Sequence, residues 1–438
     1  MFAARAAAAV AGSMAGVAAR RFGSSGAVAA AAAAGGSKAK VGDIFTPTEE
    51  HGSLRTMLRG FAETMVEPQA KEFNRAEKFN VPLFQELGKL GLLGITVDEK
   101  YGGSGMDATA VVIANEELSA SDPAFCLSFL AHSLLFANNL NCNGNEEQKA
   151  RLLPRICTGE LLGGMGMTEP ASGTDVLGMK SHAKKHADGS FSLYGAKMWI
   201  TNGSRADGVL GDVFLVYART AAADAKPAGG KAHSLFLVEK GMPGFALGQV
   251  VKDKCGMRAS NTAELVFDGV RVPAANVVGT EGDAMLHMMR NLELERLALA
   301  AMSLGIARRS IEIMNRYARD RLSFGQPLNR YGQIQKHIAD SYAAYAAGRA
   351  YVYNVASRHS LTATGGRLDS DGVKLYCSEM ATAVANRAMQ VLGGNGYTGE
   401  YVVERLWRDA KLLEIGGGTT EAHEKNMTRD MTKVDRLP

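Results

Sequence analysis

Cysteines are few and scattered in this chain of 438 residues. There are five, an odd number, and no two form a CxxC pair: Cys126, Cys142, Cys157, Cys255 and Cys377. Their spacing predicts neither a disulfide framework nor a metal site, and it fits a reducing compartment. The HExxH, Walker A and GxSxG patterns are also absent, so the sequence gives no sign of a zinc peptidase, a P-loop nucleotide site or a serine hydrolase elbow.

Acidic residues are missing from the first 40 positions, and the first one in the chain is Asp43. This segment is rich in Ala, Gly and Ser. Its five positive charges are Arg5, Arg20, Arg21, Lys38 and Lys40. Such a composition is typical of a mitochondrial transit peptide, which we expect over residues 1–40. A low-complexity tail without a targeting role is the alternative. The apolar residues of this segment are mostly Ala and Gly, too weakly hydrophobic for a membrane span.

The net charge gives no reason to expect a nucleic-acid partner. The formal charge is +4, and without the five positive charges of residues 1–40 the remainder is near −1. The basic isoelectric point therefore belongs largely to the predicted leader. With 46% hydrophobic and 21% charged residues, the composition is that of an ordinary globular protein, long enough for two or three domains.

The residue pattern changes twice along the chain, which predicts three domains. Helical patterns extend over residues 41–161, short β-rich runs over 162–280, and helical patterns again over 281–438. Among the β-rich runs are Val213–Tyr217 and Leu235–Val238. We expect an α+β protein whose middle domain is a small barrel or sandwich, because no βαβ alternation predicts a parallel sheet.

The first helix should begin near residue 46. The Thr-Pro-Thr-Glu run at 46–49 has the pattern of a capping box with proline at the first helical position. Leu54, Leu58, Phe61 and Met65 then follow at spacings of four, three and four. These spacings place the four apolar side chains on one face of an amphipathic helix.

A literal GxGxxG pattern occurs at Gly394–Gly399. The dinucleotide fingerprint needs a strand before it and a helix after it, within a βαβ unit. This copy follows a helical pattern over Ser378–Leu392. We therefore expect no Rossmann-type nucleotide site there.

Further motifs are spread in order over residues 45 to 430. They are Gly166–Gly178, Trp199–Gly203, Val238–Phe245, Gly256–Thr262, Arg321–Gly325 and Gln390–Lys411. Together they resemble the acyl-CoA dehydrogenase family. The resemblance implies the acyl-CoA dehydrogenase fold, with an N-terminal helical domain, a middle β-barrel domain and a C-terminal four-helix bundle. It also implies FAD as the cofactor and an acyl-CoA as the substrate.

The same resemblance implies a set of FAD contacts. They are Met167, Thr168, Gly173, Thr174, Trp199, Ile200, Thr201, Arg321, Ser323, Phe324, Gln390, Gly393, Gly394, Thr419 and Glu421. On its own, Trp199 would be expected in the core, and Arg321 would be a solvated cation at a helix end. In the family the glycine-rich segment reaches FAD across a subunit interface, which implies a homo-oligomer, expected to be a tetramer. Eleven residues after Arg321, relatives carry Gln, whereas this chain has Gly332.

The segment Arg408–Glu421 departs from the family at one place. Most members carry a Tyr-Glu pair whose Glu is the catalytic base, and this chain has Gly416-Gly417 instead. The reaction removes a proton from Cα of the acyl group while hydride leaves Cβ, so it needs a carboxylate near Cα in a dry site. Gly417 cannot supply one. Its N–H could still bind the thioester carbonyl as one arm of an oxyanion hole.

Glu295 is the expected replacement for that base. The segment Asn291–Ala300 resembles the helix of the isovaleryl type within the family, in which the Glu directly before Arg is the base. Glu293 and Glu295 are two residues apart, so they point to nearly opposite faces of a helix. Leu299 places Glu295 beside an apolar stripe, where a carboxylate needs a partner or a function. The alternative is an ordinary Glu-Arg pair on a solvated face.

Gly416 bears on the choice of substrate. Glycine in place of an aromatic residue leaves room for a branching methyl near Cβ, as in the isovaleryl type. The resemblance implies substrate contacts at Thr174, Glu293, Leu294, Arg296 and Gly416. We expect oxidation of isovaleryl-CoA to 3-methylcrotonyl-CoA in leucine breakdown, in the mitochondrial matrix, with electrons passed to electron-transfer flavoprotein.

Three other functions remain open from the sequence. One is the same chemistry on another short acyl-CoA, branched such as 2-methylbutyryl or straight. A second is an acyl-CoA oxidase that uses oxygen. The third is a catalytically silent flavin-binding scaffold, which Gly417 favours and Glu295 opposes.

Overall fold

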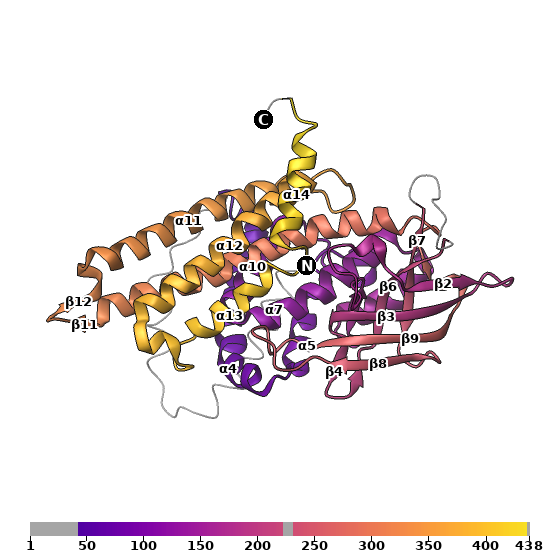
Figure 1. Cartoon of the computed structure of the whole chain (residues 1–438), viewed down its shortest axis with the longest axis horizontal. Helices are drawn as coiled ribbons and strands as arrows, with labels where there is room; N and C mark the ends of the chain where they lie inside the picture. The colour runs from indigo at the N-terminus through magenta and orange to yellow at the C-terminus, as the bar shows by residue number, and fades with distance from the viewer. Residues whose placement is uncertain (1–42, 222–230, 436–438) are drawn as a thin grey trace.

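The computed structural model describes residues 43–221 and 231–435, which fold into three parts that follow one another in sequence. N-terminal helices lie in the middle of Figure 1, with a curled sheet on one side and a long helix bundle on the other. The α+β class predicted from the sequence is therefore confirmed. The predicted transit peptide, residues 1–40, lies outside the described residues.

The N-terminal part is helical, as its sequence pattern predicts. Its elements are α3 (Glu49–Phe61), η1 (Ala62–Val66), α4 (Glu67–Ala76), α5 (Val81–Lys89), η2 (Glu99–Tyr101), α6 (Ala108–Ser121), α7 (Pro123–Leu130), η3 (Ala131–Asn138), α8 (Asn139–Asn143) and α9 (Glu146–Cys157). Leu54, Leu58 and Phe61 are buried on one face of α3, which confirms the spacing argument. Met65, in η1, is partly buried against the same core.

The predicted helix start at residue 46 is wrong by two positions. Thr48 is the N-cap of α3, and its hydroxyl accepts a hydrogen bond from the His51 N–H at 3.3 Å. Thr46 belongs to the preceding turn instead. Its N–H and hydroxyl both donate to Asp43 Oδ1, at 2.8 and 3.0 Å. Because Asp43 holds Thr46 in that turn, the helix begins at the next residue able to cap it.

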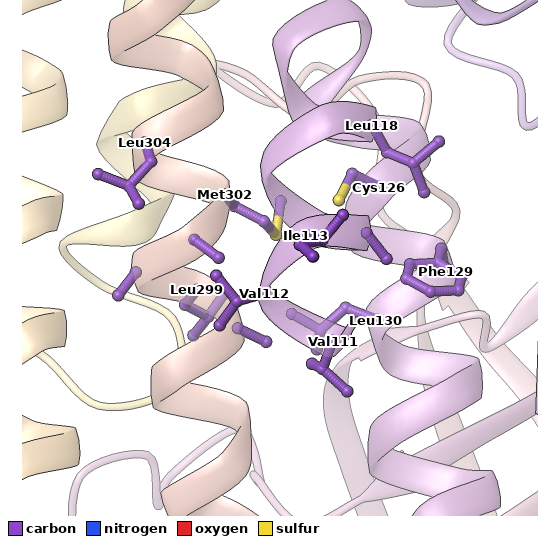
Figure 2. Packing of buried hydrophobic residues seen from close by; sticks show 14 of the residues in the cluster. Val111, Val112, Ile113, Leu118, Cys126, Phe129, Leu130, Leu299, Met302 and Leu304 are labelled. Atoms are coloured by element: carbon purple, nitrogen blue, oxygen red, sulfur yellow. The ribbon is translucent and has the colours of Figure 1, made fainter. Parts of the chain in front are cut away.

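Helix α6 is buried on all sides, although six of its 14 residues are polar or charged, among them Glu116 and Glu117. Figure 2 shows Val112 and Ile113 of α6 meeting Leu299 and Met302 of α10 (Ala284–Asp320). All four side chains are fully or almost fully buried. The main core therefore joins the N-terminal part to the helix that carries the predicted base.

One helical stretch, Pro123–Asn143, is long and apolar enough to cross a membrane by length and composition. Its mean hydropathy is 1.2, and 89% of that window is buried by the surrounding protein. Burial of this kind is expected for the core helix of a globular fold.

The middle part is an eight-stranded sheet. Its strands are β1 (Gly163–Gly166), β2 (His182–Lys185), β3 (Phe191–Thr201), β6 (Val213–Arg219), β7 (His233–Glu239), β8 (Phe245–Val250), β9 (Thr262–Val272) and β10 (Val277–Val278). The order is β10-β7-β6-β2-β3-β9-β8, with β1 beside β6. A small separate hairpin is formed by β4 (Ser204–Ala206) and β5 (Val209–Leu210). The two strands predicted at 213–217 and 235–238 are confirmed as parts of β6 and β7.

The sheet curls around its own apolar core, as expected for a small barrel. Phe191 of β3 packs on Phe236 of β7 with ring centroids 5.1 Å apart, although other strands separate β3 from β7 in the sheet. Phe214 of β6 likewise reaches Phe245 of β8, at 5.7 Å. The opposite faces of β6 and β7 pack against the N-terminal helices, so both strands are buried on two sides. This double burial explains their continuous apolar sequences.

The C-terminal part is a helix bundle formed by α10, α11 (Gly332–Ala356), α12 (Arg367–Leu392) and α13 (Val403–Leu413), followed by α14 (Thr420–Met431). The hairpin of β11 (Leu322–Ser323) and β12 (Gln326–Pro327) lies at the end of the bundle far from the sheet (Figure 1). Helix α12 leads directly into the 3-10 turn η8 (Gly393–Tyr397), which confirms that no strand precedes the GxGxxG pattern. We keep 41–161, 162–280 and 281–438 as the proposed domain limits.

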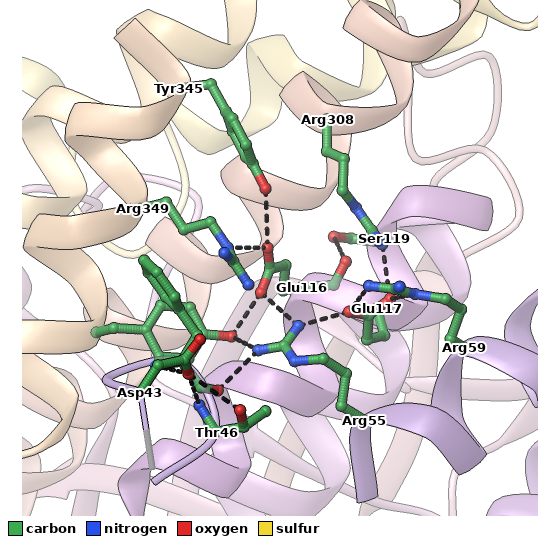
Figure 3. Close-up of polar contacts among 12 residues, drawn as sticks. Asp43, Thr46, Arg55, Arg59, Glu116, Glu117, Ser119, Arg308, Tyr345 and Arg349 are labelled. Atoms are coloured by element: carbon green, nitrogen blue, oxygen red, sulfur yellow. Dashed lines mark hydrogen bonds and ion pairs between the residues drawn. The ribbon is translucent and has the colours of Figure 1, made fainter. Parts of the chain in front are cut away.

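A buried charge network joins the N-terminal helices to the bundle (Figure 3). Glu116 of α6 binds Arg55 of α3 at 2.9 Å and Arg349 of α11 at 3.0 Å. Glu117 binds Arg308 of α10 at 2.7 Å. Burial opposes ionisation of Glu116, but Arg349 and Arg55 outweigh it and hold the pKa of this carboxyl well below its usual range. Both carboxylates therefore serve to hold helices together.

Candidate active site

The turn that carries Gly417 lies between α13 and α14, against α10. Gly417 and Gly418 adopt φ angles of 68° and 106°, in the region that favours glycine. A methyl group added to Gly417 would lie 2.3 Å from Leu299 Cδ1 and 3.6 Å from Glu295 Oε1. The backbone angle and the position of Leu299 therefore both disfavour a side chain at 417. The same geometry shows that the carboxylate of Glu295 lies next to the Cβ position of residue 417.

Glu295 is buried within α10, with 8% of its surface exposed. Burial raises the pKa of its carboxyl to about 7, against the opposing effect of the nearby cations Arg296 and Lys374. Its Oε2 atom has no hydrogen-bond partner among the described residues. A carboxylate with a pKa near neutral and one free oxygen has the properties of a general base.

The N–H of Gly417 makes no hydrogen bond within the described residues. The N–H groups of Ile415 and Gly416, by contrast, both donate to Leu412 O. Gly417 therefore keeps a donor available for a ligand, next to the carboxylate of Glu295. A methyl group added to Gly416 would make ordinary van der Waals contact with Leu412, at 3.5 Å or more, and would meet no clash.

Three predicted substrate contacts are engaged inside the protein. Glu293 accepts hydrogen bonds from the N–H groups of Gly365 and Gly366, at 3.3 and 3.0 Å, ahead of α12. Arg296 binds Asp371 at 2.9 Å and donates to Gly417 O at 3.5 Å. Leu294 is 1% exposed and belongs to the main core. The prediction that Glu293 and Glu295 face opposite sides agrees with these contacts, while substrate contact by the three residues stays a prediction.

Trp199 is the most unusual residue of the predicted flavin site. Its side chain is 58% exposed, so the expectation of a core tryptophan is wrong. Its φ of 64° lies in the left-handed region, at a break in the register of β3 with β9 between Lys197 and Ile200. A bulge of this kind turns a side chain away from the sheet core, and strained residues cluster at functional sites. The neighbouring Met198 N–H donates to Thr168 O at 2.9 Å, which brings the two predicted flavin segments together.

Sequence reasoning missed the pair that holds this region in place. Lys197 is fully buried, and its ammonium binds Glu169 Oε1 at 2.9 Å and Met167 O at 3.0 Å. The carboxylate of Glu169 also accepts from the N–H groups of Lys180 and Ser181. Burial opposes ionisation of Glu169, but Lys197 and these donors lower its pKa to about 2. The sequence did contain a signal for the burial of Lys197, because side chains alternate along a strand and Lys197 lies on the same face of β3 as buried apolar residues.

The remaining predicted FAD contacts form two groups. One group has exposed or half-exposed positions: Gly173 and Thr174 lie on the loop that follows the segment at 167–168, and Thr419 and Glu421 lie at the start of α14. Arg321, Ser323, Phe324, Gln390, Gly393 and Gly394 lie instead at the hairpin and the end of α12. Along α10, Arg321 is about 26 residues from Glu295, or about 39 Å at the usual helical rise. One chain therefore carries the two groups at opposite ends of its bundle (Figure 1).

Comparison with known proteins agrees with this architecture. Family models match residues 48–160, 164–270 and 285–432, as the N-terminal, middle and C-terminal domains of acyl-CoA dehydrogenases. The mitochondrial isovaleryl-CoA dehydrogenase of Pongo abelii is 43% identical over 85% of this chain and 86% of its own length. The chain belongs to the acyl-CoA dehydrogenase family. The acyl-CoA dehydrogenase fold expected from the sequence is thereby confirmed.

Other family members broaden the comparison. The mitochondrial isovaleryl-CoA dehydrogenase of Oryza sativa subsp. japonica is 41% identical over 90% of this chain and 93% of its own length. A mitochondrial 2-methylacyl-CoA dehydrogenase of Solanum tuberosum is 39% identical over 85% and 88%. Among solved structures, butyryl-CoA dehydrogenase from Megasphaera elsdenii has a TM-score of 0.81 at 34% identity, covering 89% of this chain and 98% of its own. A glutaryl-CoA dehydrogenase from Mycobacterium smegmatis in complex with FADH2 has a TM-score of 0.81 at 28% identity, covering 89% and 96%.

Proposed function

We propose that this acyl-CoA dehydrogenase oxidises isovaleryl-CoA to 3-methylcrotonyl-CoA, with Glu295 as the catalytic base. The observation that carries the proposal is the position of Glu295 Oε1, 3.6 Å from where a methyl group on Gly417 would lie. Position 417 bears the base in most of the family. A carboxylate that enters the same space from α10 can do the same work.

Glu295 and Gly417 divide the chemistry between them. The Gly417 N–H donates to the thioester carbonyl of the substrate and stabilises the negative charge that develops there as the Cα–H bond weakens. The carboxylate of Glu295 accepts the Cα proton, for which a pKa of about 7 is well suited. Bound FAD supplies the acceptor for the hydride that leaves Cβ. Leu299, packed against Gly417, helps to keep water away from the carboxylate.

The residues fit FAD in two places. On the sheet side, the exposed indole of Trp199 and the half-buried Met167, Thr168 and Thr201 would offer a surface for the flavin ring, whereas Ile200 is buried in the sheet core. At the other end of the bundle, Arg321, Ser323 and the exposed Gly393-Gly394 would hold the nucleotide. Because Arg321 lies about 39 Å along α10 from Glu295, the proposed base, we propose that the second group comes from a neighbouring subunit. This arrangement requires at least a dimer, and we propose a homotetramer.

Gly416 supports a short branched substrate, because it carries no side chain where most of the family has an aromatic one. The isovaleryl-CoA dehydrogenases among the relatives support the same choice. The 2-methylacyl-CoA dehydrogenase of potato favours a second candidate, a 2-methyl-branched acyl-CoA. As partner we propose electron-transfer flavoprotein, and as location the mitochondrial matrix, since several relatives are mitochondrial.

Anaerobic bleaching of the flavin absorbance tests the proposal. Isovaleryl-, 2-methylbutyryl-, butyryl- and palmitoyl-CoA are added separately to the purified FAD-loaded protein. We expect the fastest bleaching with isovaleryl-CoA. Fastest bleaching with 2-methylbutyryl-CoA would move the substrate to the second candidate. A bound flavin that none of the four reduces would contradict the enzymatic function and favour a silent scaffold.

A further inference from the structure

A buried cluster of charged side chains surrounds the Gly417–Gly418 turn. Asp371 and Lys374 come from the first two turns of α12, His423 comes from α14 and Arg296 from α10. Asp371 and His423 are fully buried, and Lys374 is 1% exposed. Four charged or titratable groups in one enclosed place are costly unless each is bonded, so their arrangement calls for an explanation.

Most of their hydrogen bonds converge on two backbone carbonyls. Lys374 Nζ donates to Gly418 O at 2.7 Å, and His423 Nε2 lies 3.0 Å from the same oxygen. Arg296 Nε donates to Gly417 O at 3.5 Å. Asp371 Oδ1 binds both Arg296 and His423, at 2.9 and 2.7 Å, and so ties two of these side chains together.

The turn depends on these contacts because it has no side chains of its own. Gly416, Gly417 and Gly418 are consecutive, and two of them have positive φ angles, so the backbone alone would sample many conformations. Holding the carbonyls of Gly417 and Gly418 fixes the peptide planes on either side of Gly418. On the other side, the N–H of Gly416 donates to Leu412 O and anchors the 415–416 peptide. The 416–417 peptide, which carries the free N–H of Gly417, lies between these anchored planes and is thereby held near the carboxylate of Glu295.

The protonation state of His423 changes how many hydrogen bonds its ring makes, but the turn does not depend on that state. Both of its ring nitrogens face acceptors, Asp371 and Gly418 O, so only the imidazolium can donate to both. Burial and the cations Lys374 and Arg296 lower the pKa of His423, against the attraction of Asp371. The neutral ring keeps one of the two bonds. Lys374 then remains the donor to Gly418 O, which makes it the most informative residue to change.

We propose that Lys374, Asp371 and His423 are positioning residues of the dehydrogenation. They hold the Gly417–Gly418 turn so that its free N–H and the Glu295 carboxylate meet the same acyl-CoA. The inference rests on the proposed function, and it adds to it three residues that would touch neither substrate nor cofactor. Since misplacement of a catalytic group by about 1 Å costs about 100-fold in rate, a loose turn should slow the reaction strongly.

The test compares Lys374→Met with wild type as FAD-loaded proteins. Amide hydrogen exchange of the peptide that contains residues 416–418 reports the turn directly, without any reaction, through the Gly416 N–H, which donates to Leu412 O. We expect faster exchange there in Lys374→Met, and flavin reduction by isovaleryl-CoA slowed about 10- to 100-fold. Titratable groups that act on Glu295 are Arg296 on its own helix, Lys374 on α12 and Tyr217 on β6. Loss of the Lys374 cation should also move the inflection of the rate with pH upward, which a purely structural role would not do.

Two further variants keep the experiment decisive. Lys374→Arg retains a charged donor and should recover most of the rate and the slow exchange. Lys425→Met makes the same chemical change at an exposed position of α14 and should match wild type. If Lys374→Met unfolds or loses FAD, His423→Gln, which keeps an amide donor but no charge, together with Asp371→Asn, takes its place.

Unchanged exchange at 416–418 and a rate within twofold of wild type in Lys374→Met would overturn the proposal. Failure of the proposed function looks different. In that case wild type itself would not be reduced by isovaleryl-CoA, while the exchange comparison would still show whether Lys374 holds the turn.

Discussion

Buried carboxylates lie on α6 (Glu116 and Glu117) and on α10 (Glu295), and their surroundings shift the carboxyl pKa values in opposite directions. Glu116 and Glu117 are bound by arginines from three helices, and the network lowers the pKa of both carboxyl groups against the effect of burial. Glu295 is also buried, but its Oε2 atom has no partner within the described part of the chain, and burial raises the pKa of its carboxyl to about 7. Paired carboxylates join helices, whereas an unpaired one keeps a site for a proton.

The largest expected effect is on activity, and it should appear when Glu295 is changed. Glu295→Gln should slow flavin reduction by isovaleryl-CoA about 10²- to 10⁴-fold, because a general base contributes on that order. The protein should remain yellow, since the substitution leaves the proposed FAD contacts untouched. Stopped-flow absorbance measures the rate, and the flavin spectrum measures retention. A variant as fast as wild type would remove Glu295 from the chemistry.

Measurements of stability should rank the two carboxylates in the opposite order, with the larger loss at Glu116 rather than at Glu295. Glu116→Gln leaves Arg349 without a carboxylate partner and Arg55 with Glu117 alone, and should lower the free energy of unfolding by about 3–5 kcal/mol at pH 8. Glu295→Gln should leave it unchanged or raise it by about 1–3 kcal/mol, because ionised Glu295 carries a burial penalty.

The pH dependence of that stability follows from the signs of the two shifts. The folded pKa of Glu295 is raised, so its penalty appears as pH rises from about 4.5 to 7 and is absent at pH 4. The advantage of Glu295→Gln should therefore vanish in acid. Glu116 stays ionised in the folded state down to low pH, so Glu116→Gln should remain destabilising at pH 5. Urea unfolding at pH 8 and pH 5 measures both, and equal losses for the two variants would contradict the distinction.

Alanine substitutions at Gly416 and Gly417 should have different effects on stability. Gly417→Ala meets Leu299 at 2.3 Å and has an unfavourable φ, so we expect a loss of about 1–3 kcal/mol and reduced activity. Adding Leu299→Ala should recover part of the stability, since it relieves the clash but not the strain. Gly416→Ala is the matched control, because its methyl group makes only ordinary contacts. Thermal unfolding distinguishes them, and a Gly417→Ala variant as stable as Gly416→Ala would contradict the geometry.

The smallest effect is expected at Lys197, which pairs with Glu169. Lys197→Met removes the ammonium that binds Met167 O and should weaken FAD retention about tenfold, or ~1.4 kcal/mol. Flavin fluorescence on release measures the affinity. Unchanged affinity would mean that Glu169 and its backbone donors hold the segment without Lys197.

The sequence predicted the parts of this molecule that depend on local pattern. The two central strands, the buried face of α3 and the absence of a strand before Gly394 follow from periodicity and neighbours in sequence. The exposure of Trp199 did not follow, because a register break in a strand is set by its partner strand. Asp371, Lys374 and His423 were missed for a similar reason. They lie up to about 50 residues apart and meet only when α12 and α14 pack together.

The pH dependence of single-turnover flavin reduction tests the central claim most directly. At low isovaleryl-CoA concentration it reports the free enzyme, in which we expect the rate to rise with an inflection near pH 7. The small residual rate of Glu295→Gln should lack that inflection. The same inflection in both proteins, or none in wild type, would show that the proton is taken by another group.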